Sequence, residues 1–285
     1  MDIKEKKTMY NIGAMLNCHG KDFDFYRAFS EAKEMGLSSC QISIWDPTLY
    51  TDENAKAIND ACAALDFKVS CLWAGYTGPC EWNFIDGPGT IGLVPHEFRA
   101  MRLEQLAQAS VFAEKIGVTD IATHVGFIPE NPNTTEYRDL IASLRWLCRI
   151  YKARGQNFLF ETGQETPITV LRSIEEIGTG NAFINFDTAN VMLYGKGNPV
   201  DAIRVFGKYV RNTHIKDGSY PTDGKHLGRE TKVGEGLADF PTILKMLKEC
   251  GYTGPYTIER EITGDRQKQD IADTAAYLKS ILDTL

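Results

Sequence analysis

Several segments that would decide the class of this protein are missing from its 285 residues. No window reaches the roughly 18 apolar residues of a membrane-spanning helix, and no apolar core of a secretion signal follows the charged first residues. Residues 16–20, which follow the first predicted strand, read Leu-Asn-Cys-His-Gly and contain no G-x-G-x-x-G loop for a dinucleotide. We therefore expect a cytoplasmic protein without a membrane partner and without a doubly wound dinucleotide-binding sheet.

Basic charge and paired cysteines are scarce as well. The chain has 31 Lys and Arg against 38 Asp and Glu, which gives a formal net charge of −7. Nucleic-acid affinity comes from clustered Lys and Arg, so this balance disfavours a nucleic-acid partner. The seven cysteines are scattered, odd in number and form no C-x-x-C pair, which indicates reduced thiols without a zinc clip or redox motif.

What the sequence does contain is a regular alternation of short β-rich runs and longer amphipathic stretches. The predicted strands are 10–15, 39–44, 68–73, 120–124, 157–161, 182–187, 210–215 and 256–259. The predicted helices are 22–35, 52–66, 97–116, 135–154, 167–178, 199–207, 239–250 and 267–284. Glycines end five of them, where a left-handed residue is needed: Gly36, Gly117, Gly155, Gly178 and Gly251. Eight such units predict one α/β domain over 1–285, a (β/α)₈ TIM barrel.

Polar residues interrupt the last four predicted strands at their carboxyl ends. They are Glu161, Asp187, His214 and Glu259. In such a barrel these ends meet at one face, where three carboxylates would repel one another unless a cation held them. Three oxygen donors and one imidazole suit one divalent metal ion, Mn²⁺ or Mg²⁺, with Co²⁺ or Zn²⁺ as alternatives. A metal-free carboxylate site is the other interpretation, because one acidic residue at a strand end is often only a helix cap.

These residues lie in segments that resemble the xylose isomerase-like TIM barrels, a superfamily that includes sugar phosphate isomerases and epimerases and endonuclease IV-type enzymes. The segments are 160–165 (Phe-Glu-Thr-Gly-Gln-Glu), 185–190 (Asn-Phe-Asp-Thr-Ala-Asn), 193–199, 214–217 (His-Ile-Lys-Asp), 233–236 and 257–261. The resemblance implies a single divalent ion held by Glu161, Asp187, His214 and Glu259. It also implies that Glu161 and Glu259 act as acid and base on opposite faces of a sugar, and it suggests a homodimer or homotetramer.

Two departures from the pattern of that family reduce the number of metal ions expected at the site. Epimerases and endonuclease IV commonly have histidine three residues after the strand-six aspartate, where this chain has Asn190. The endonuclease also needs a histidine near the end of strand three, where residues 72–75 read Leu-Trp-Ala-Gly. These absences exclude a trinuclear DNA-repair centre and leave one metal ion.

Further residues near the predicted strand ends are candidates for contacts with a substrate. They are Trp73, His124, Asn190, Lys216, Arg229 and Glu235. Each has a plainer interpretation: His124 as a buried structural residue, Trp73 as core, and the charged residues of the loop after strand seven as solvated side chains. Aromatic residues beyond strands one to four suit the apolar face of a sugar ring or the packing of the core: Trp45, Trp73, Tyr76, Trp82 and Phe127. Residues 75–95, rich in Gly and Pro, are predicted to form an active-site loop.

The function predicted from these features is that of a metal-dependent isomerase or epimerase of a sugar or sugar phosphate. Glu161 and Glu259 would move the proton through a metal-stabilised enediolate. One alternative is a lyase or dehydratase that acts on a keto-sugar or inositol derivative by the same first step. Another is a barrel that binds sugar without catalysis. The sequence favours neither epimerisation nor aldose–ketose exchange.

Overall fold

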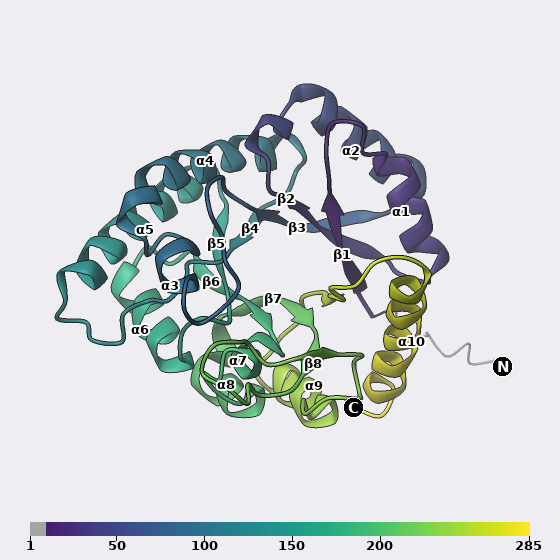
Figure 1. Cartoon of the computed structure of the whole chain (residues 1–285). Coiled ribbons are helices and arrows are strands. Elements are labelled where there is room, and N and C mark those ends of the chain that lie inside the picture. The colour runs from purple at the N-terminus through teal and green to yellow at the C-terminus, as the bar shows by residue number, and fades with distance from the viewer. Residues whose placement is uncertain (1–9) are drawn as a thin grey trace.

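Eight parallel strands close into a barrel in the computed structural model, which describes residues 10–285 (Figure 1). Residues 1–9 of the single domain predicted for 1–285 lie outside the described part. The strand order around the barrel is β1-β10-β7-β6-β5-β4-β3-β2. The strands are β1 (Ile12–Cys18), β2 (Ser39–Ile44), β3 (Lys68–Ala74), β4 (Asp120–Thr123), β5 (Asn157–Glu161), β6 (Ala182–Asp187), β7 (Val210–Ile215) and β10 (Tyr256–Ile258). The predicted TIM barrel is confirmed.

Eight longer helices surround the barrel at the predicted places. They are α1 (Phe25–Glu34), α2 (Asp52–Leu65), α4 (His96–Lys115), α5 (Thr135–Ala153), α6 (Pro167–Ile177), α8 (Pro199–Phe206), α9 (Phe240–Glu249) and α10 (Asp265–Leu282). All five predicted glycine caps have positive φ angles, between 64° and 82°. In α1 the side chain of Asp24 accepts the Arg27 N–H at 2.9 Å, and Phe25, Phe29 and Ala32 face the strands. Within the described residues no helix is long and apolar enough to cross a membrane.

Several short elements were not predicted, and most of them lie at the carboxyl ends of the strands. They are η1 (Pro47–Leu49), α3 (Gly87–Thr90), α7 (Asn190–Leu193), η2 (Gly207–Tyr209) and the antiparallel pair β8 (Asp217–Gly218) and β9 (Glu230–Thr231). The first strand also differs: it spans Ile12–Cys18 where 10–15 was predicted. Its pairing with β2 continues to Cys18 opposite Ile44, so tertiary hydrogen bonding extends it past the apolar run.

A layer of amides inside the barrel positions the residues above it. Gln41 of β2 donates from Nε2 to Asn185 Oδ1 of β6 and to Asn212 Oδ1 of β7, both at 2.8 Å. Its carbonyl oxygen Oε1 lies 3.0 Å from Nε2 of His214. All four side chains are buried. Because buried amides are costly unless they are paired, this layer fixes the orientation of the strand ends on one side of the barrel.

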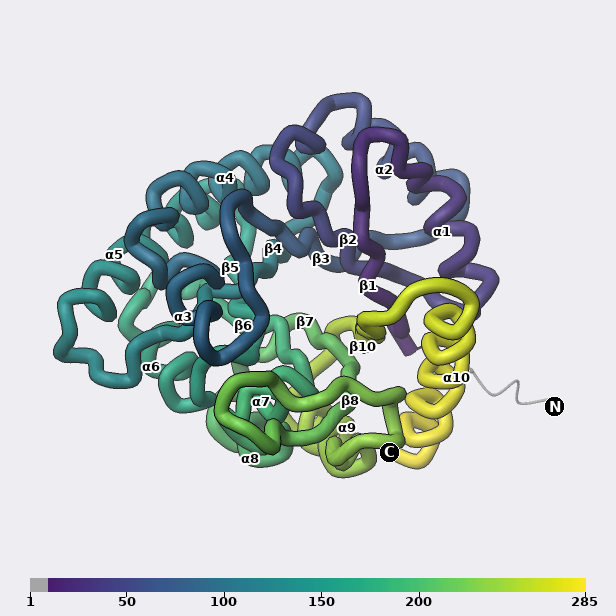
Figure 2. The backbone as a smooth tube through the Cα atoms, viewed as in Figure 1, coloured from purple at the N-terminus to yellow at the C-terminus, as the bar shows by residue number. Residues whose placement is uncertain are grey.

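Two loops meet over the carboxyl ends of the strands. The loop of residues 75–95 contains α3, and the loop of residues 219–229 joins β8 to β9; Figure 2 traces them in blue and green. The backbone N–H of Phe84 donates to the Lys225 carbonyl at 3.1 Å, and that of Gly228 donates to the Leu193 carbonyl at 2.8 Å. The backbone of Ile91 packs directly against Gly126, whose φ is 100°. A Cβ atom on residue 126 would lie only 2.2 Å from the Ile91 carbonyl oxygen. The two loops therefore cover the carboxyl ends of the strands and contact each other, the segment after β4 and helix α7.

Candidate metal centre and active-site cavity

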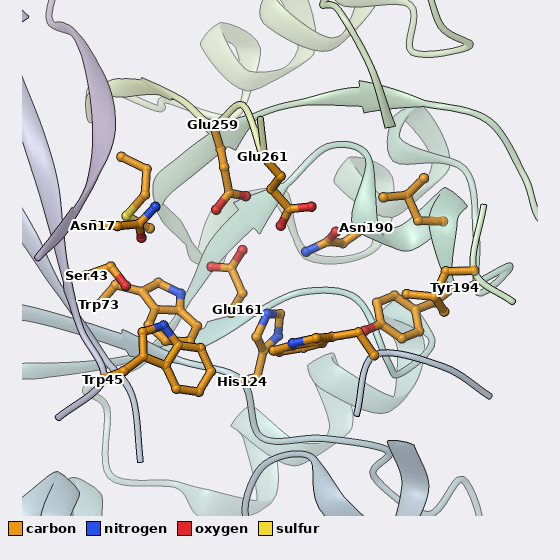
Figure 3. Close-up of a pocket in the computed structure, with 14 residues that line it drawn as sticks. Asn17, Ser43, Trp45, Trp73, His124, Glu161, Asn190, Tyr194, Glu259 and Glu261 are labelled. Carbon is orange, nitrogen blue, oxygen red and sulfur yellow. The ribbon is translucent and has the colours of Figure 1, made fainter. Parts of the chain in front are cut away.

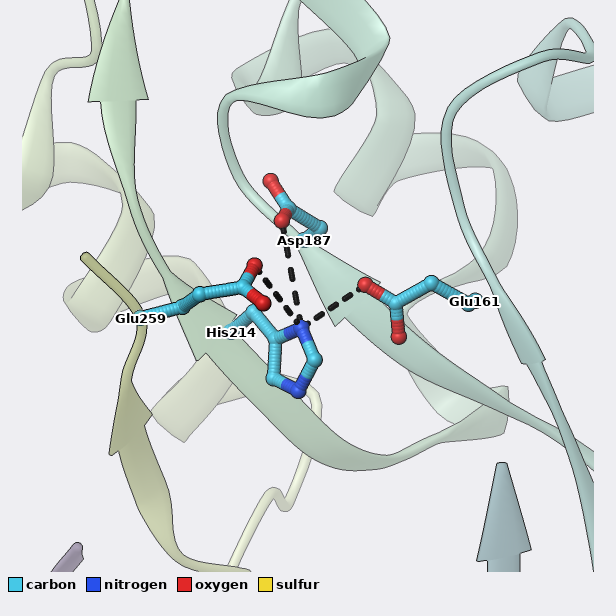
Figure 4. A group of neighbouring side chains, drawn as sticks. All are labelled: Glu161, Asp187, His214 and Glu259. Carbon is cyan, nitrogen blue, oxygen red and sulfur yellow. Dashed lines mark ion pairs between the residues drawn. The ribbon is translucent and has the colours of Figure 1, made fainter. Parts of the chain in front are cut away.

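The four predicted ligands converge at one side of the barrel mouth (Figure 4). Glu161 ends β5, Asp187 ends β6, His214 lies near the end of β7, and Glu259 directly follows β10. One donor atom from each side chain lies within 4.8 Å of the others. From Nδ1 of His214 the distances are 2.8 Å to Glu161 Oε1, 3.3 Å to Glu259 Oε2 and 3.9 Å to Asp187 Oδ2. The strand-end pattern thus led to residues that do come together.

The hydrogen bonds around the cluster leave donor atoms turned toward its centre. His214 uses Nε2 for Gln41, so Nδ1 faces the carboxylates. Asp187 Oδ1 accepts the N–H groups of Ala189 at 2.8 Å and Asn190 at 2.7 Å, whereas the buried Oδ2 receives no hydrogen bond. Buried polar atoms are normally paired, and oriented imidazole and carboxylate ligands are typical of metal sites. The residues fit one divalent ion.

Lys216 lies behind the cluster and balances part of its negative charge. Its Nζ is 2.8 Å from Glu261 Oε1, 3.2 Å from Glu259 Oε2 and 3.7 Å from Asp187 Oδ2. Burial disfavours the charged ammonium, but the surrounding carboxylates outweigh it and raise the pKa of Lys216 well above its usual value. Burial likewise opposes the charge of Glu259, yet Lys216 and His214 lower the pKa of that carboxyl. Lys216 is therefore held as a cation by its neighbours.

A cavity of about 390 Å³ opens above the cluster (Figure 3). Of the four predicted ligands, Glu161 and Glu259 line it, whereas Asp187 and His214 do not. Aromatic rings form the facing wall: Trp45 lies 5.0 Å from Trp73 and 6.2 Å from Trp82, and Trp82 lies 5.1 Å from His124 between ring centroids. A carboxylate side and an indole side are suited to the hydroxyls and the apolar face of a sugar ring.

The other predicted contact residues divide into two groups. Trp73, His124 and Asn190 line the cavity, and Lys216 reaches its edge through Glu259 and Asn190, whose Oδ1 is 3.4 Å from Nζ. Arg229 and Glu235 are exposed and do not line the cavity, so their contact with a substrate stays a prediction.

Asp217 holds the loop after β7. Its carboxylate accepts backbone N–H groups of Gly218, Gly234, Gly236 and Ala238 at 2.8–3.0 Å. The carboxylate thus fixes the backbone of the Gly-rich turn.

Some lining residues were missed by the sequence reasoning. They are Met15, Asn17, Ser43, Leu193, Tyr194, Leu227 and Glu261. Asn17 and Ser43 lie near the ends of β1 and β2, so they carry the same signal as the four predicted ligands, a polar residue near the carboxyl end of an apolar strand. Glu261 lies three residues beyond β10 and pairs with Lys216, a contact with no sequence signal.

Glu165, in the loop after β5, gives a prediction about stability. Burial raises the pKa of its carboxyl from about 4.5 to about 8. Between these values the folded protein keeps a proton that the unfolded chain has lost, so this residue costs stability as pH rises through that window. Glu165→Gln should remove the cost: its stability relative to the native protein should rise by roughly 4 kcal/mol between pH 5 and pH 8.5. Urea unfolding at both pH values measures this.

The exposed Glu136→Gln variant is the control, because it makes the same substitution in a side chain that lies at the surface. A stability difference between Glu165→Gln and the native protein that does not change with pH would show that the carboxyl is solvated in the folded protein.

Comparison with known proteins gives consistent results. The model of a family described as xylose isomerase-like TIM barrel matches residues 29–281. The crystal structure of a xylose isomerase domain protein from Planctomyces limnophilus is 33% identical, with a TM-score of 0.88 over 95% of this chain and 97% of that one. The apo 3-keto-D-glucoside 4-epimerase of E. coli is 18% identical, with a TM-score of 0.72 over 95% of this chain and all of the other, a likeness of fold.

A curated relative, the inosose dehydratase of Clostridium beijerinckii, is 23% identical over 145 residues, which are 45% of this chain and 48% of that protein. The curated relatives are matched over about half their length, between 47% and 60%. The chain is thus similar over part of its length to an inosose dehydratase, and in fold to a 3-keto-D-glucoside 4-epimerase.

Proposed function

The chain belongs to the xylose isomerase-like TIM barrel family, and on this premise we propose that it is a divalent-metal-dependent isomerase or epimerase of sugars. One observation carries the proposal. Among the four clustered residues, Glu161 and Glu259 line the cavity from two different strands, whereas Asp187 and His214 do not reach it. This arrangement supports two roles: Asp187 and His214 as ligands alone, and the two glutamates as ligands that also exchange protons with a substrate.

The chemistry follows from the positions of the residues. A divalent ion held by Glu161, Asp187, His214 and Glu259, with Mn²⁺ or Mg²⁺ best suited to these donors, supplies Lewis-acid stabilisation of negative charge on a carbonyl oxygen. One glutamate takes the proton from the carbon beside the carbonyl, and the other returns a proton. The indole wall holds the ring against the carboxylates and keeps water out.

Return of the proton to the same carbon from the opposite face produces an epimer. Return to the neighbouring carbon interconverts aldose and ketose. The positions of Glu161 on β5 and Glu259 beyond β10 favour two faces, since the two strands are separated by β6 and β7 in the barrel. The similarity in fold to a 3-keto-D-glucoside 4-epimerase is consistent with a substrate that carries a ketone.

The second candidate is a dehydratase, which the match to an inosose dehydratase favours. It would begin with the same proton removal and end with loss of a β-hydroxyl as water. The two candidates therefore differ in product and not in the first step. A non-catalytic sugar-binding barrel would perform neither step.

Solvent exchange tests the proposal. The Mn²⁺-loaded protein, incubated with ketoses and keto-glycosides in D₂O, should incorporate deuterium at the carbon beside the carbonyl and release an epimer or the isomeric aldose, as seen by NMR. A product lighter by one water would favour the dehydratase. Sugar binding measured by calorimetry, with no deuterium incorporated from any sugar, would leave only the non-catalytic barrel.

A further inference from the structure

A second cavity adjoins the one above the metal centre. It has a volume of about 460 Å³ and lies between the end of β1, helix α1, the loop after β10 and helix α10. Four residues line both cavities: Met15, Asn17, Glu259 and Glu261. Glu259 is a candidate ligand, so the second cavity begins at the reacting centre and runs toward the outer helices. The two cavities together form one site with two compartments.

The lining of the second compartment is mixed. Apolar surface comes from Phe23, Met35 and Ile271, and hydrogen-bonding groups come from Thr263 and Gln267. Pockets for sugars combine an apolar wall with a few convergent polar groups. The second compartment thus also offers an apolar wall with hydrogen-bonding groups, without a second cluster of metal ligands among the described residues.

The charges argue against a phosphorylated or carboxylated substrate. Among the described residues no Lys or Arg lines the first compartment, and Glu261, which is not among the predicted ligands, adds a carboxylate that would repel an anion. Lys216 is already surrounded by carboxylates.

Both long cations of the second compartment are also paired. Lys268 Nζ lies 2.9 Å from Glu31 Oε2. Arg260 lies 3.0 Å from Glu230 Oε2 and 2.9 Å from Asp270 Oδ2. A phosphate would have to share its cation with a carboxylate, and the two negative groups would then lie close together.

We infer that the substrate is an uncharged glycoside. Its keto-sugar ring occupies the compartment above the metal centre, and the sugar linked to it occupies the compartment between α1 and α10. This inference rests on the proposed function, because it assigns the substrate class of the same site. The linked ring reaches Thr263 and Phe23. The second compartment therefore favours a disaccharide over a monosaccharide, and the first compartment recognises the ketone of the substrate.

The test uses two matched series: D-fructose, lactulose and D-fructose 6-phosphate, and 3-keto-D-glucose, 3-keto-trehalose and 3-keto-D-glucose 6-phosphate. Deuterium exchange by the Mn²⁺-loaded protein gives kcat/KM for each. In at least one series, kcat/KM should be about tenfold or more higher for the disaccharide than for the monosaccharide, and lowest for the phosphate. Thr263→Trp, which places an indole in the second compartment, should remove the preference for the disaccharide.

Thr119→Trp is the matched control, because Thr119 is exposed and precedes β4 at the opposite end of the barrel. It should retain the preference of the native protein. Exchange that is fastest with a monosaccharide or a phosphate, or a preference that Thr263→Trp leaves intact, would overturn the inference and leave the proposed function standing. Absence of exchange in both series would count against both.

Discussion

Replacing both Asp187 and His214 by alanine is expected to abolish stoichiometric binding of a divalent ion. Both side chains are fully enclosed, with relative exposures of 0% and 1%, and neither lines the cavity. Both donor atoms, Oδ2 of Asp187 and Nδ1 of His214, face the centre, while their other polar atoms are held by the backbone and by Gln41. Removal of two of four protein ligands leaves only Glu161 and Glu259.

Loss of two ligands should weaken binding by several orders of magnitude, because loss of an outer-shell partner alone typically costs about 10- to 100-fold. Elemental analysis after dialysis against Mn²⁺ and gel filtration measures the metal per chain. We expect about one ion per chain in the native protein and close to none in the double variant, with unchanged circular dichroism.

The control for this experiment is the Asp120→Ala, His96→Ala variant. Asp120 is buried at the start of β4, where it pairs with Arg211 at 3.1 Å, and His96 is exposed at the start of α4. The control therefore removes the same two residue types from outside the cluster. Stoichiometric metal in the Asp187→Ala, His214→Ala variant would place the ion elsewhere, and loss of metal in the control would attribute the effect to general destabilisation.

The parts of the fold that could be predicted are those whose signals are local. The helix ends at Gly36 and Gly178 follow from the left-handed conformation that only glycine adopts cheaply, and the eight strands follow from apolar runs between amphipathic stretches. Helix α7 had no such signal. It begins where Asp187 Oδ1 accepts two backbone N–H groups, so the same carboxylate caps a short helix and offers its other oxygen to the cluster.

The residues of the site also differ in whether a local sequence signal predicts them. Glu161, Asp187, His214 and Glu259 were readable because each interrupts an apolar strand at its end. Gln41 was not, because a polar residue inside a strand gives no indication of the partners it will find across the barrel on β6 and β7. Glu261 and the second compartment depend on how α1 and α10 pack around the barrel, which no pattern within one segment contains.

Glu161→Gln and Glu259→Gln should each lower the rate of epimer formation by about 10³-fold, within the range for loss of a general acid or base. Glutamine keeps an oxygen that can bind the metal but cannot carry the proton. The carboxylates differ in their surroundings: Glu161 Oε2 accepts from Asn185 Nδ2, whereas Glu259 lies 3.2 Å from Lys216 and is partly exposed. Glu161 and Glu259 are therefore positioned by different neighbours. We expect that neither carboxylate can take over the proton transfer of the other.

Exchange at one face distinguishes a two-base mechanism from the loss of activity in general. Each variant keeps one glutamate, which can still remove the proton from the epimer whose C–H bond faces it. That variant should exchange deuterium into this epimer without converting it to the other. The other variant should show the same behaviour with the opposite epimer. Glu230→Gln, which alters a carboxylate paired with Arg260 outside the first cavity, is the control and should lower the rate far less. If both glutamate variants lose exchange into both epimers while they retain the metal, one glutamate must depend on the other. The assignment of Glu161 and Glu259 to opposite faces would then be wrong.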